Sequence, residues 1–175
     1  ITVFNPGPGG GTSNAVNFLI NQSGSGCRTI CFQSAQYYLL NLSALPNGSV
    51  LIGGVNNNVP ISIQQNLADI QRALQNSSGG LAFLNQQYLS AQISLAAADG
   101  AVGSPGVLNS SLRCYSLNFT VVSLSNGIRI TPNTTLGNLL TQARLAILES
   151  RLEDMNKLGQ VLLQLNGNSP TSRCR

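Results

Sequence analysis

The sequence lacks most of the side chains that enzymes use for acid–base chemistry. Its 175 residues include no histidine and no tryptophan, and only five aspartate and glutamate residues. Histidine most often transfers protons near neutral pH, and carboxylates are the usual substitute. A serine or cysteine nucleophile would likewise lack the base that activates it. All five acids lie in or beside expected helices, where ion pairing and helix ends account for them. We therefore expect no enzyme, no catalytic residue, no cofactor and no metal.

Charge is also scarce, and its distribution argues against two further classes of protein. Charged residues make up 8% of the chain, against about a quarter in an average protein. The eight arginines and the single lysine are scattered and do not interleave with aromatic residues, as they would in a nucleic-acid-binding face. No apolar run approaches the roughly eighteen residues of a membrane span. A weakly charged polar surface suits a protein that works outside the cell or packs against copies of itself.

The four cysteines, Cys27, Cys31, Cys114 and Cys174, point to disulfide bonds. A zinc site made of four thiolates would need two close pairs, and only Cys27 and Cys31 are close. Free thiols remain the alternative. Two disulfides imply an oxidising compartment, and four cysteines allow three pairings between which the sequence does not choose.

The first twenty residues are expected to form a β-hairpin. "ITVF" and "AVNFLI" flank the turn-rich stretch "NPGPGGGTSN", and the chain begins without methionine, so we expect a segment upstream. A two-stranded hairpin is marginal alone and exposes its backbone edges. It could join the sheet of its own chain, belong with missing upstream strands, or complete a neighbouring molecule by donor-strand pairing. A head-to-tail contact of the last kind propagates into a fibre. The side chains expected to make it are Ile1, Val3, Phe4, Val16, Phe18 and Ile20.

A glycine- and serine-rich joint at residues 21–26 separates this arm from the remaining chain, and residues 27–175 are expected to form one disulfide-bonded α+β domain. Apolar spacing and turn residues predict antiparallel β-hairpins covered by about four helices. The hairpins are expected at residues 36–55, around Pro46-Asn47-Gly48, and at 115–131, around Ser125-Asn126-Gly127. The helices are expected at residues 62–76, 81–99, 136–149 and 151–166.

Within these helices the sequence predicts caps, faces and ion pairs. Ser62 is expected to cap the first helix and Thr135 the third. The helix at residues 81–99 is expected to bury one face, made of Leu81, Leu84, Tyr88, Ala91 and Leu95. Glu153 and Lys157 are spaced to pair along the last helix, and Asp69 is expected to pair with Arg72 or face water.

Two stretches resemble known families. "ITVFNPGPGGGTSNAVNFLI" resembles the closing two strands of a TIG/IPT-type immunoglobulin-like domain, through an NP-x-PGGG-x-SN turn; it covers 20 of the 175 residues, and the earlier strands of that sandwich are absent. "CFQSAQYYLLNLSALPNGSVLIGGVN" and "LNQQYLSAQISLAAADG" are similar to a C-terminal region of large secreted surface proteins of acidobacterial-type soil bacteria. That resemblance implies export and an extracellular or cell-surface setting, and implies nothing catalytic.

Two functions remain open on this evidence. The first is a secreted, non-enzymatic structural protein that self-associates, such as the subunit of an extracellular filament linked through residues 1–20. The alternative is a glycan- or protein-binding module at the C-terminus of a multidomain surface protein, with Tyr37, Tyr38 and Tyr115 stacking on the ligand. The same tyrosines would serve equally as core or cross-strand residues.

Overall fold

The computed structural model describes residues 27, 30–53, 59–99 and 105–167, which form a mixed α+β domain as expected. The arm, the joint at 21–26 and Cys174 lie outside the described residues. The elements in chain order are α1 (Ala35–Leu40), η1 (Leu42–Ala44), β1 (Ser49–Val50), β2 (Ile61–Ser62), α2 (Leu67–Gln75), α3 (Gly80–Asp99), α4 (Pro105–Leu108), η2 (Leu112–Tyr115), β3 (Val122–Ser123), β4 (Arg129–Ile130), α5 (Leu136–Leu148) and α6 (Leu152–Gly167).

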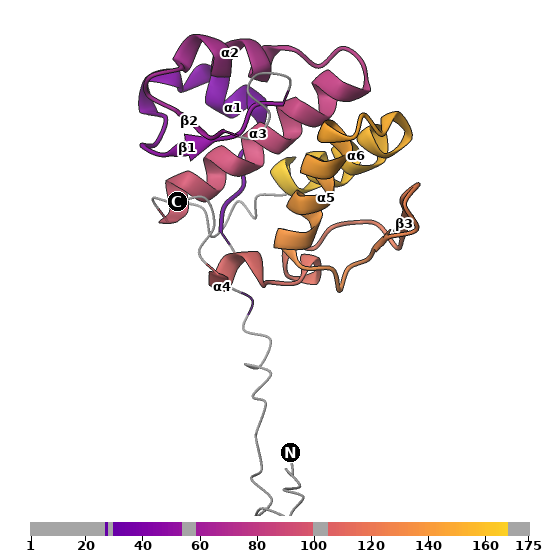
Figure 1. Cartoon of the computed structure of the whole chain (residues 1–175). Coiled ribbons are helices and arrows are strands. Elements are labelled where there is room, and N and C mark those ends of the chain that lie inside the picture. Colours follow the sequence, from indigo (N-terminus) through magenta and orange to yellow (C-terminus); the bar gives the residue numbers. More distant parts are fainter. Residues whose placement is uncertain (1–26, 28–29, 54–58, 100–104, 168–175) are drawn as a thin grey trace, which may run out of the picture.

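Helix α3 crosses the middle of the domain, with α5 and α6 on one side and α1, α2 and the β1–β2 pair on the other (Figure 1). Leu84 and Leu95 belong to a core cluster with α5 and α6, whereas Leu89 and Ile93 belong to a second cluster with α1 and α2. Four of the five residues expected on one face, Leu84, Tyr88, Ala91 and Leu95, lie together in the first cluster. The second cluster was not expected, and it forms because neighbours on another side of α3 bury further apolar residues of that helix. Leu81, placed on that face, is 42% exposed.

The last two helices match the prediction closely. The Thr135 side chain caps α5 by accepting a hydrogen bond from the backbone N–H of Asn138 at 3.2 Å. The apolar stripes of α5 and α6 are buried, except for Leu152 at the start of α6. Lys157 is not paired with Glu153. Its Nζ donates to the carbonyl oxygen of Ser123 at 3.0 Å and so ties α6 to β3.

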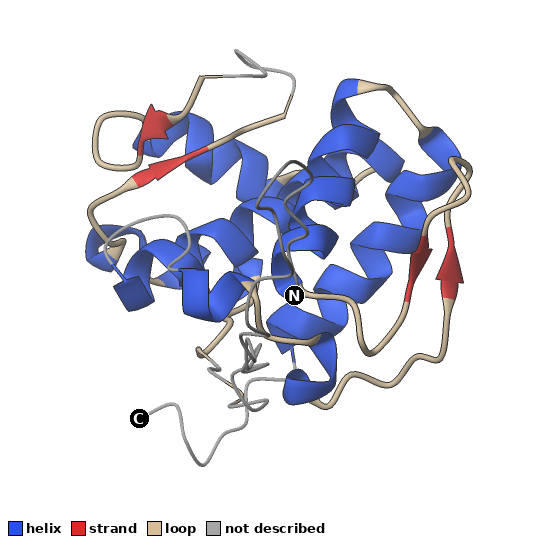
Figure 2. Cartoon of the chain, turned by 60° about the horizontal axis from the view of Figure 1, so that its bottom comes forward, coloured by secondary structure: helices blue, strands red, loops and turns tan. Residues whose placement is uncertain are grey.

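The two β pairs are separate and lie on opposite sides of the helical body (Figure 2). β3 and β4 form the hairpin expected within 115–131, with Gly127 at φ +80° in its turn, where a residue without a side chain is favoured. Each strand is only two residues long, and the chain at Leu112–Tyr115 forms a 3₁₀ turn instead of a strand.

The hairpin expected at residues 36–55 was wrong. Residues 35–40 form α1, whose N-terminus is capped by Ser34. The partner of β1 is β2, whose second residue, Ser62, was expected to cap a helix. Ser62 therefore lies in a strand and caps nothing, and α2 begins only at Leu67, after Asn66. The side chain of Asn66 donates to the carbonyl oxygen of Ser62 at 2.8 Å, so a local polar contact joins strand to helix.

Candidate functional site

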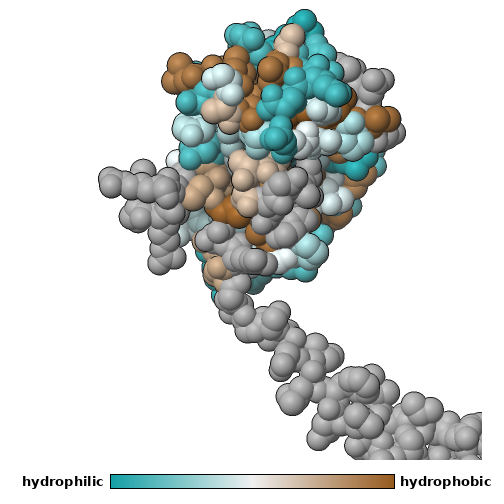
Figure 3. Space-filling model, turned by 90° about the vertical axis from the view of Figure 1, so that its left-hand side faces the viewer, coloured by the Kyte–Doolittle hydropathy of each residue, from teal (hydrophilic) through white to brown (hydrophobic). Residues whose placement is uncertain are grey.

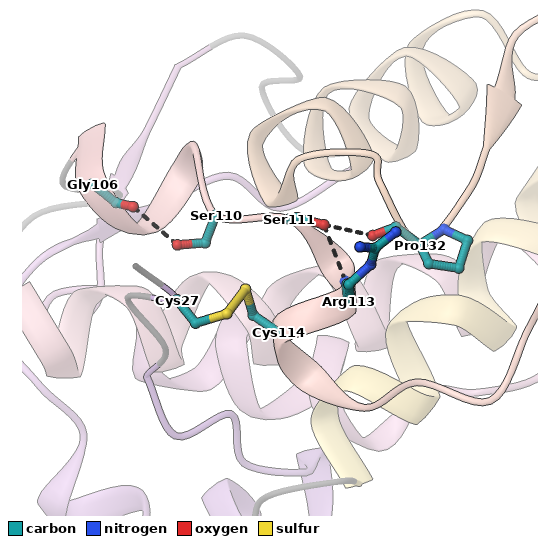
Figure 4. Close-up of a disulfide and its surroundings, with 7 residues drawn as sticks. All are labelled: Cys27, Gly106, Ser110, Ser111, Arg113, Cys114 and Pro132. Atoms are coloured by element: carbon teal, nitrogen blue, oxygen red, sulfur yellow. Dashed lines mark hydrogen bonds between the residues drawn. A yellow bond between two sulfur atoms is a disulfide. The ribbon is translucent and has the colours of Figure 1, made fainter. Parts of the chain in front are cut away.

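A disulfide bond links Cys27 to Cys114, two residues separated by 87 positions in sequence (Figure 4). The Cα atoms are 5.4 Å apart. Cys114 belongs to η2, which is held in place by residues 132–134 of the same chain. The Ser111 hydroxyl donates to the carbonyl oxygen of Pro132 at 2.6 Å, and the N–H of Leu112 donates to the carbonyl oxygen of Thr134 at 2.8 Å. The first described residue of the domain is thus covalently attached to a well-braced turn.

Cys31 is disulfide-bonded as well, and Cys174 lies outside the described residues. Free thiols are therefore wrong for the three cysteines that the structure describes. Within the same ranges, no three His, Cys, Asp or Glu side chains gather in a group that could hold a metal ion.

The three tyrosines that we considered as a binding platform do not share one surface. Tyr38 is buried and hydrogen-bonded to the Ser94 hydroxyl at 2.8 Å, and Tyr115 is buried edge-on against Phe32. Burial raises the pKa of each to about 12, with the Ser94 hydrogen bond opposing part of the shift at Tyr38. Only Tyr37 of the three is exposed, at 46%. A stacking site built on all three is excluded, because two of the rings belong to the core.

Among the acidic residues, Asp69 and Glu149 form ion pairs at the surface, and Asp154 forms a buried one. Asp69 pairs with Arg72 at 2.9 Å on the exposed face of α2. Asp154 is fully buried, and the guanidinium group of Arg151 lies 2.6 Å from its carboxylate. Its two oxygens also accept hydrogen bonds from the backbone N–H and the hydroxyl of Ser125, at 2.8 and 2.7 Å. Asp154 therefore joins α6 to the turn between β3 and β4.

Burial by itself would raise the pKa of the Asp154 carboxyl group. The hydrogen bonds from Ser125 and the positive charge of Arg151 outweigh that effect and hold its pKa below the ordinary value of 3.8. Asp154 is thus ionised at neutral pH and fully occupied by structural contacts. It does not offer a proton or a free lone pair to a substrate.

A cavity of about 740 Å³ lies between β1, α3 and α5. Four partly exposed leucines form much of its wall: Leu51, Leu108, Leu145 and Leu148. Tyr88 lies at its base, and Arg144 is the one charged residue among the described residues that line it. Burial raises the pKa of Tyr88 and the charge of Arg144 partly opposes this, so the tyrosine stays protonated at neutral pH. A cavity of this size and apolar character is typical of ligand and partner sites.

Gln92 of α3 shapes the side of this cavity next to β1. It is 2% exposed, and its amide group accepts a hydrogen bond from the N–H of Leu51 at 2.8 Å and donates to the carbonyl of the same residue at 2.9 Å. One side chain therefore satisfies both backbone groups that an adjacent β-strand would otherwise bind. Sequence reasoning missed Gln92, although a glutamine among the apolar positions 91–96 is the signal that could have revealed it.

A second hollow of about 540 Å³ lies where the α2–α3 connection approaches the start of α6. The exposed leucines Leu81 and Leu152 border it, as does the Asp69–Arg72 ion pair. Asn85 donates to the carbonyl of Gly53 at 3.1 Å in its wall, while the buried Oδ1 of Asn85 has no hydrogen-bond partner among the described residues.

Buried amide side chains also connect three helices. Asn166 of α6 donates to Gln87 of α3, Gln87 donates to Gln86, and Gln86 donates to the carbonyl oxygen of Leu74 at the end of α2. These residues are structural, since each donor is used within the core. None was singled out from the sequence, because uncharged amides are abundant along the whole chain.

Comparisons of the chain with protein-family models, with curated proteins and with solved structures found no match. Among the helices in the described ranges, none combines the length and the apolar composition needed to cross a membrane.

Proposed function

We propose that this chain is an exported, non-enzymatic structural protein that self-associates through residues 1–20, as the subunit of an extracellular filament would. The observation that carries the proposal is the attachment of Cys27 to Cys114. Any load applied through the preceding residues enters the domain at Cys27 and passes across the disulfide to the braced turn at η2. A linking segment that is covalently attached to the folded domain suits a protein that bears load.

The packing of the described residues supports this proposal, because their helices bury one another. Each of the six α-helices in the described ranges packs against at least one other described helix. Among the described residues, the two core clusters are made by Phe32, α1–α6 and the segments between these helices. We propose that the apolar side chains expected in residues 1–20 are buried against another copy of the chain.

The chemistry of the ionisable groups supports a non-enzymatic role. Asp154 is held ionised by Arg151 and Ser125, and Tyr38 and Tyr115 have pKa values of about 12. None of these groups is poised to exchange a proton near neutral pH. The disulfide bond is compatible with an extracellular setting, where such bonds persist.

Sedimentation velocity and negative-stain microscopy of the full chain over a concentration series test this proposal. We expect oligomers that grow into threads, and we expect Phe18→Asp to abolish them. Asn17→Asp is the matched control, because it adds the same charge one residue away, on the opposite face of the expected strand. Circular dichroism of each variant checks that the domain remains folded. A chain that stays monomeric at all concentrations, with no effect of either substitution, would refute the proposal.

A further inference from the structure

We infer that the cavity between β1, α3 and α5 receives residues 15–20 of a second copy of the chain. This inference rests on the proposed function and names the acceptor for the linking segment. Three features of the described residues support it: a β edge beside the cavity, the character of the cavity wall, and the distance over which the segment can act.

The first feature is the side of β1 that pairs with no strand among the described residues. The N–H of Ile63 donates to the carbonyl of Gly48 at 2.9 Å, which makes residues 48 and 63 a hydrogen-bonded pair of the antiparallel ladder. Such pairs alternate along the strands, so the backbone groups of Ser49 and Leu51 point away from β2. Both residues line the cavity. Gln92 occupies the groups of Leu51, which leaves Ser49 as the point where an added strand would bind.

The second feature is the match between the cavity wall and the segment. Partly exposed leucines line the cavity, one from the residue after β1 and the others from α4 and α5, with Arg144 as the only charge in the described lining. Residues 1–26 contain no Asp, Glu, Lys or Arg, so no charge would be buried on docking. Val16, Phe18 and Ile20 alternate along the sequence, so an extended backbone would present all three to one side. Backbone pairing at the strand edge combined with alternate side chains in pockets is the usual form of β-strand addition.

The third feature is the tether. Seven peptide bonds separate Ile20 from Cys27, and a chain of seven residues spans at most about 25 Å. Because Cys27 is fixed to η2, this short tether restricts the segment to acceptors close to its own domain. Two copies in contact satisfy that limit, and a neighbour that receives one segment still presents its own to the next copy.

The face of the domain that carries β1, β2 and α1 also has apolar side chains at its surface, among polar ones (Figure 3). A neighbour seated over the cavity could therefore bury area beyond the cavity itself. The exposed wall residues are still the sharpest targets for a test, because a docked segment would cover them directly.

Thr141→Arg is the test variant. Thr141 is exposed on α5 and lines the cavity, so a larger charged side chain there obstructs the site and leaves the core intact. Gln160→Arg on the exposed side of α6, outside the cavity, adds the same charge as a matched control. In the full chain we expect Thr141→Arg to weaken self-association about tenfold, as loss of one central interface contact commonly does, and Gln160→Arg to leave it unchanged.

A synthetic peptide of residues 13–22 gives an independent readout. In excess it should shorten the assemblies of the wild-type chain, whereas the same peptide with Phe18→Asp should not. A photo-crosslinking benzoylphenylalanine in place of Phe18, in a mixture of ¹⁵N-labelled and unlabelled chains, identifies the acceptor: we expect heavy–light crosslinks to α5 or β1.

The outcomes separate the two proposals. If Phe18→Asp blocks assembly while Thr141→Arg and Gln160→Arg behave alike, the cavity is not the acceptor and the proposed function stands. If every crosslink to the cavity is intramolecular, so that no heavy–light pair is found, the segment docks in its own domain and the inference is overturned. If the full chain never assembles, both proposals fail together.

Discussion

The two sides of α3 are built by different means. On one side α5 and α6 are 13 and 16 residues long and pack through apolar stripes, with one buried ion pair at their junction. On the other side α1, β1, β2 and α2 are short, and polar side chains bind the backbone of their neighbours. Gln64 donates to the carbonyl of Leu45, Asn66 to that of Ser62, and Gln92 binds Leu51 twice.

This difference shows where order comes from on each side. Long helices satisfy their own backbone groups, so burial of a stripe is enough to place them. Short segments leave many backbone groups unpaired, and a buried unpaired group costs about 1–3 kcal/mol. Asparagine and glutamine side chains therefore replace regular secondary structure on the side of α1 and α2. Substitutions on each side of α3 should therefore destabilise that side separately, and their expected effects are given from the largest to the smallest.

Removal of the Cys27–Cys114 bond should have the largest effect. In the chain-entropy account a loop of 87 residues makes the disulfide worth about 4–5 kcal/mol. We expect the double variant Cys27→Ser, Cys114→Ser to lose about that much free energy of unfolding, measured by urea denaturation without reductant. A loss below about 1 kcal/mol would show that the unfolded state is little affected by the bond. Peptide mapping of the wild type should also find Cys31 bonded to Cys174, the only cysteine left for it.

Asp154→Asn should be the most damaging single substitution on the side of α5 and α6. It leaves Arg151 without its buried partner, and loss of one member of a buried ion pair costs about 3 kcal/mol. Asp69→Asn is the matched control: its pair with Arg72 is exposed, so the change should stay below about 0.5 kcal/mol.

The same variant predicts a pH dependence. The folded pKa of Asp154 lies below the ordinary 3.8, so the carboxylate stabilises the fold above that value and the contribution is lost as the pH falls through the folded pKa. The stability gap between wild type and Asp154→Asn should therefore be constant near neutrality and shrink below about pH 4. An unchanged gap in acid would contradict the assigned contacts.

Gln92→Met tests the other side of α3. It keeps the side-chain size while removing both hydrogen bonds to Leu51, and we expect a loss of about 2 kcal/mol. Hydrogen exchange at the Leu51 amide should accelerate strongly, while α5 and α6 remain protected. Gln65→Met, at an exposed position, should change neither quantity. Equal exchange in both variants would mean that Gln92 does not hold β1.

Gly159→Ala should have the smallest effect of the set, about 1–2 kcal/mol, because it inserts a methyl group where α6 approaches α3. A Cβ atom at position 159 would lie 2.6 Å from the ring of Phe83, which must then move. Gly167→Ala at the end of α6 meets nothing within 4 Å and should be neutral or slightly stabilising. Thermal unfolding of the two variants side by side makes the comparison.

The same contrast explains which elements could be predicted. The Thr135 cap of α5 and the apolar stripes of α5 and α6 are local in sequence, and so are the Ser125-Asn126-Gly127 turn and the Asp69–Arg72 spacing. These expectations are confirmed. Residues 35–45 contain two β-prone tyrosines among mostly helix-prone alanine, glutamine and leucine residues, and the hairpin expected there depended on the Pro46-Asn47-Gly48 turn that follows. The helix α1 is stabilised by its Ser34 cap and by the hydrogen bond between Tyr38 and Ser94, which lies 56 residues away in sequence. That contact has no signature in the local sequence.

The candidate site shows the same limit. Its leucines come from separate elements, and Gln92 matters only because Leu51 lies beside it, 41 residues away in sequence.

By itself the sequence determined the mixed α+β class, the helices that begin with a cap and carry a continuous stripe, and the scarcity of groups for acid–base chemistry. Only the tertiary structure decided that α3 is covered on several sides, that Cys27 pairs with Cys114, that Asp154 is buried, and that a cavity opens beside β1. The physical reason is range: helix caps and stripes act within a few residues, whereas burial, cysteine pairing and cavity shape depend on segments that meet only when the chain has folded.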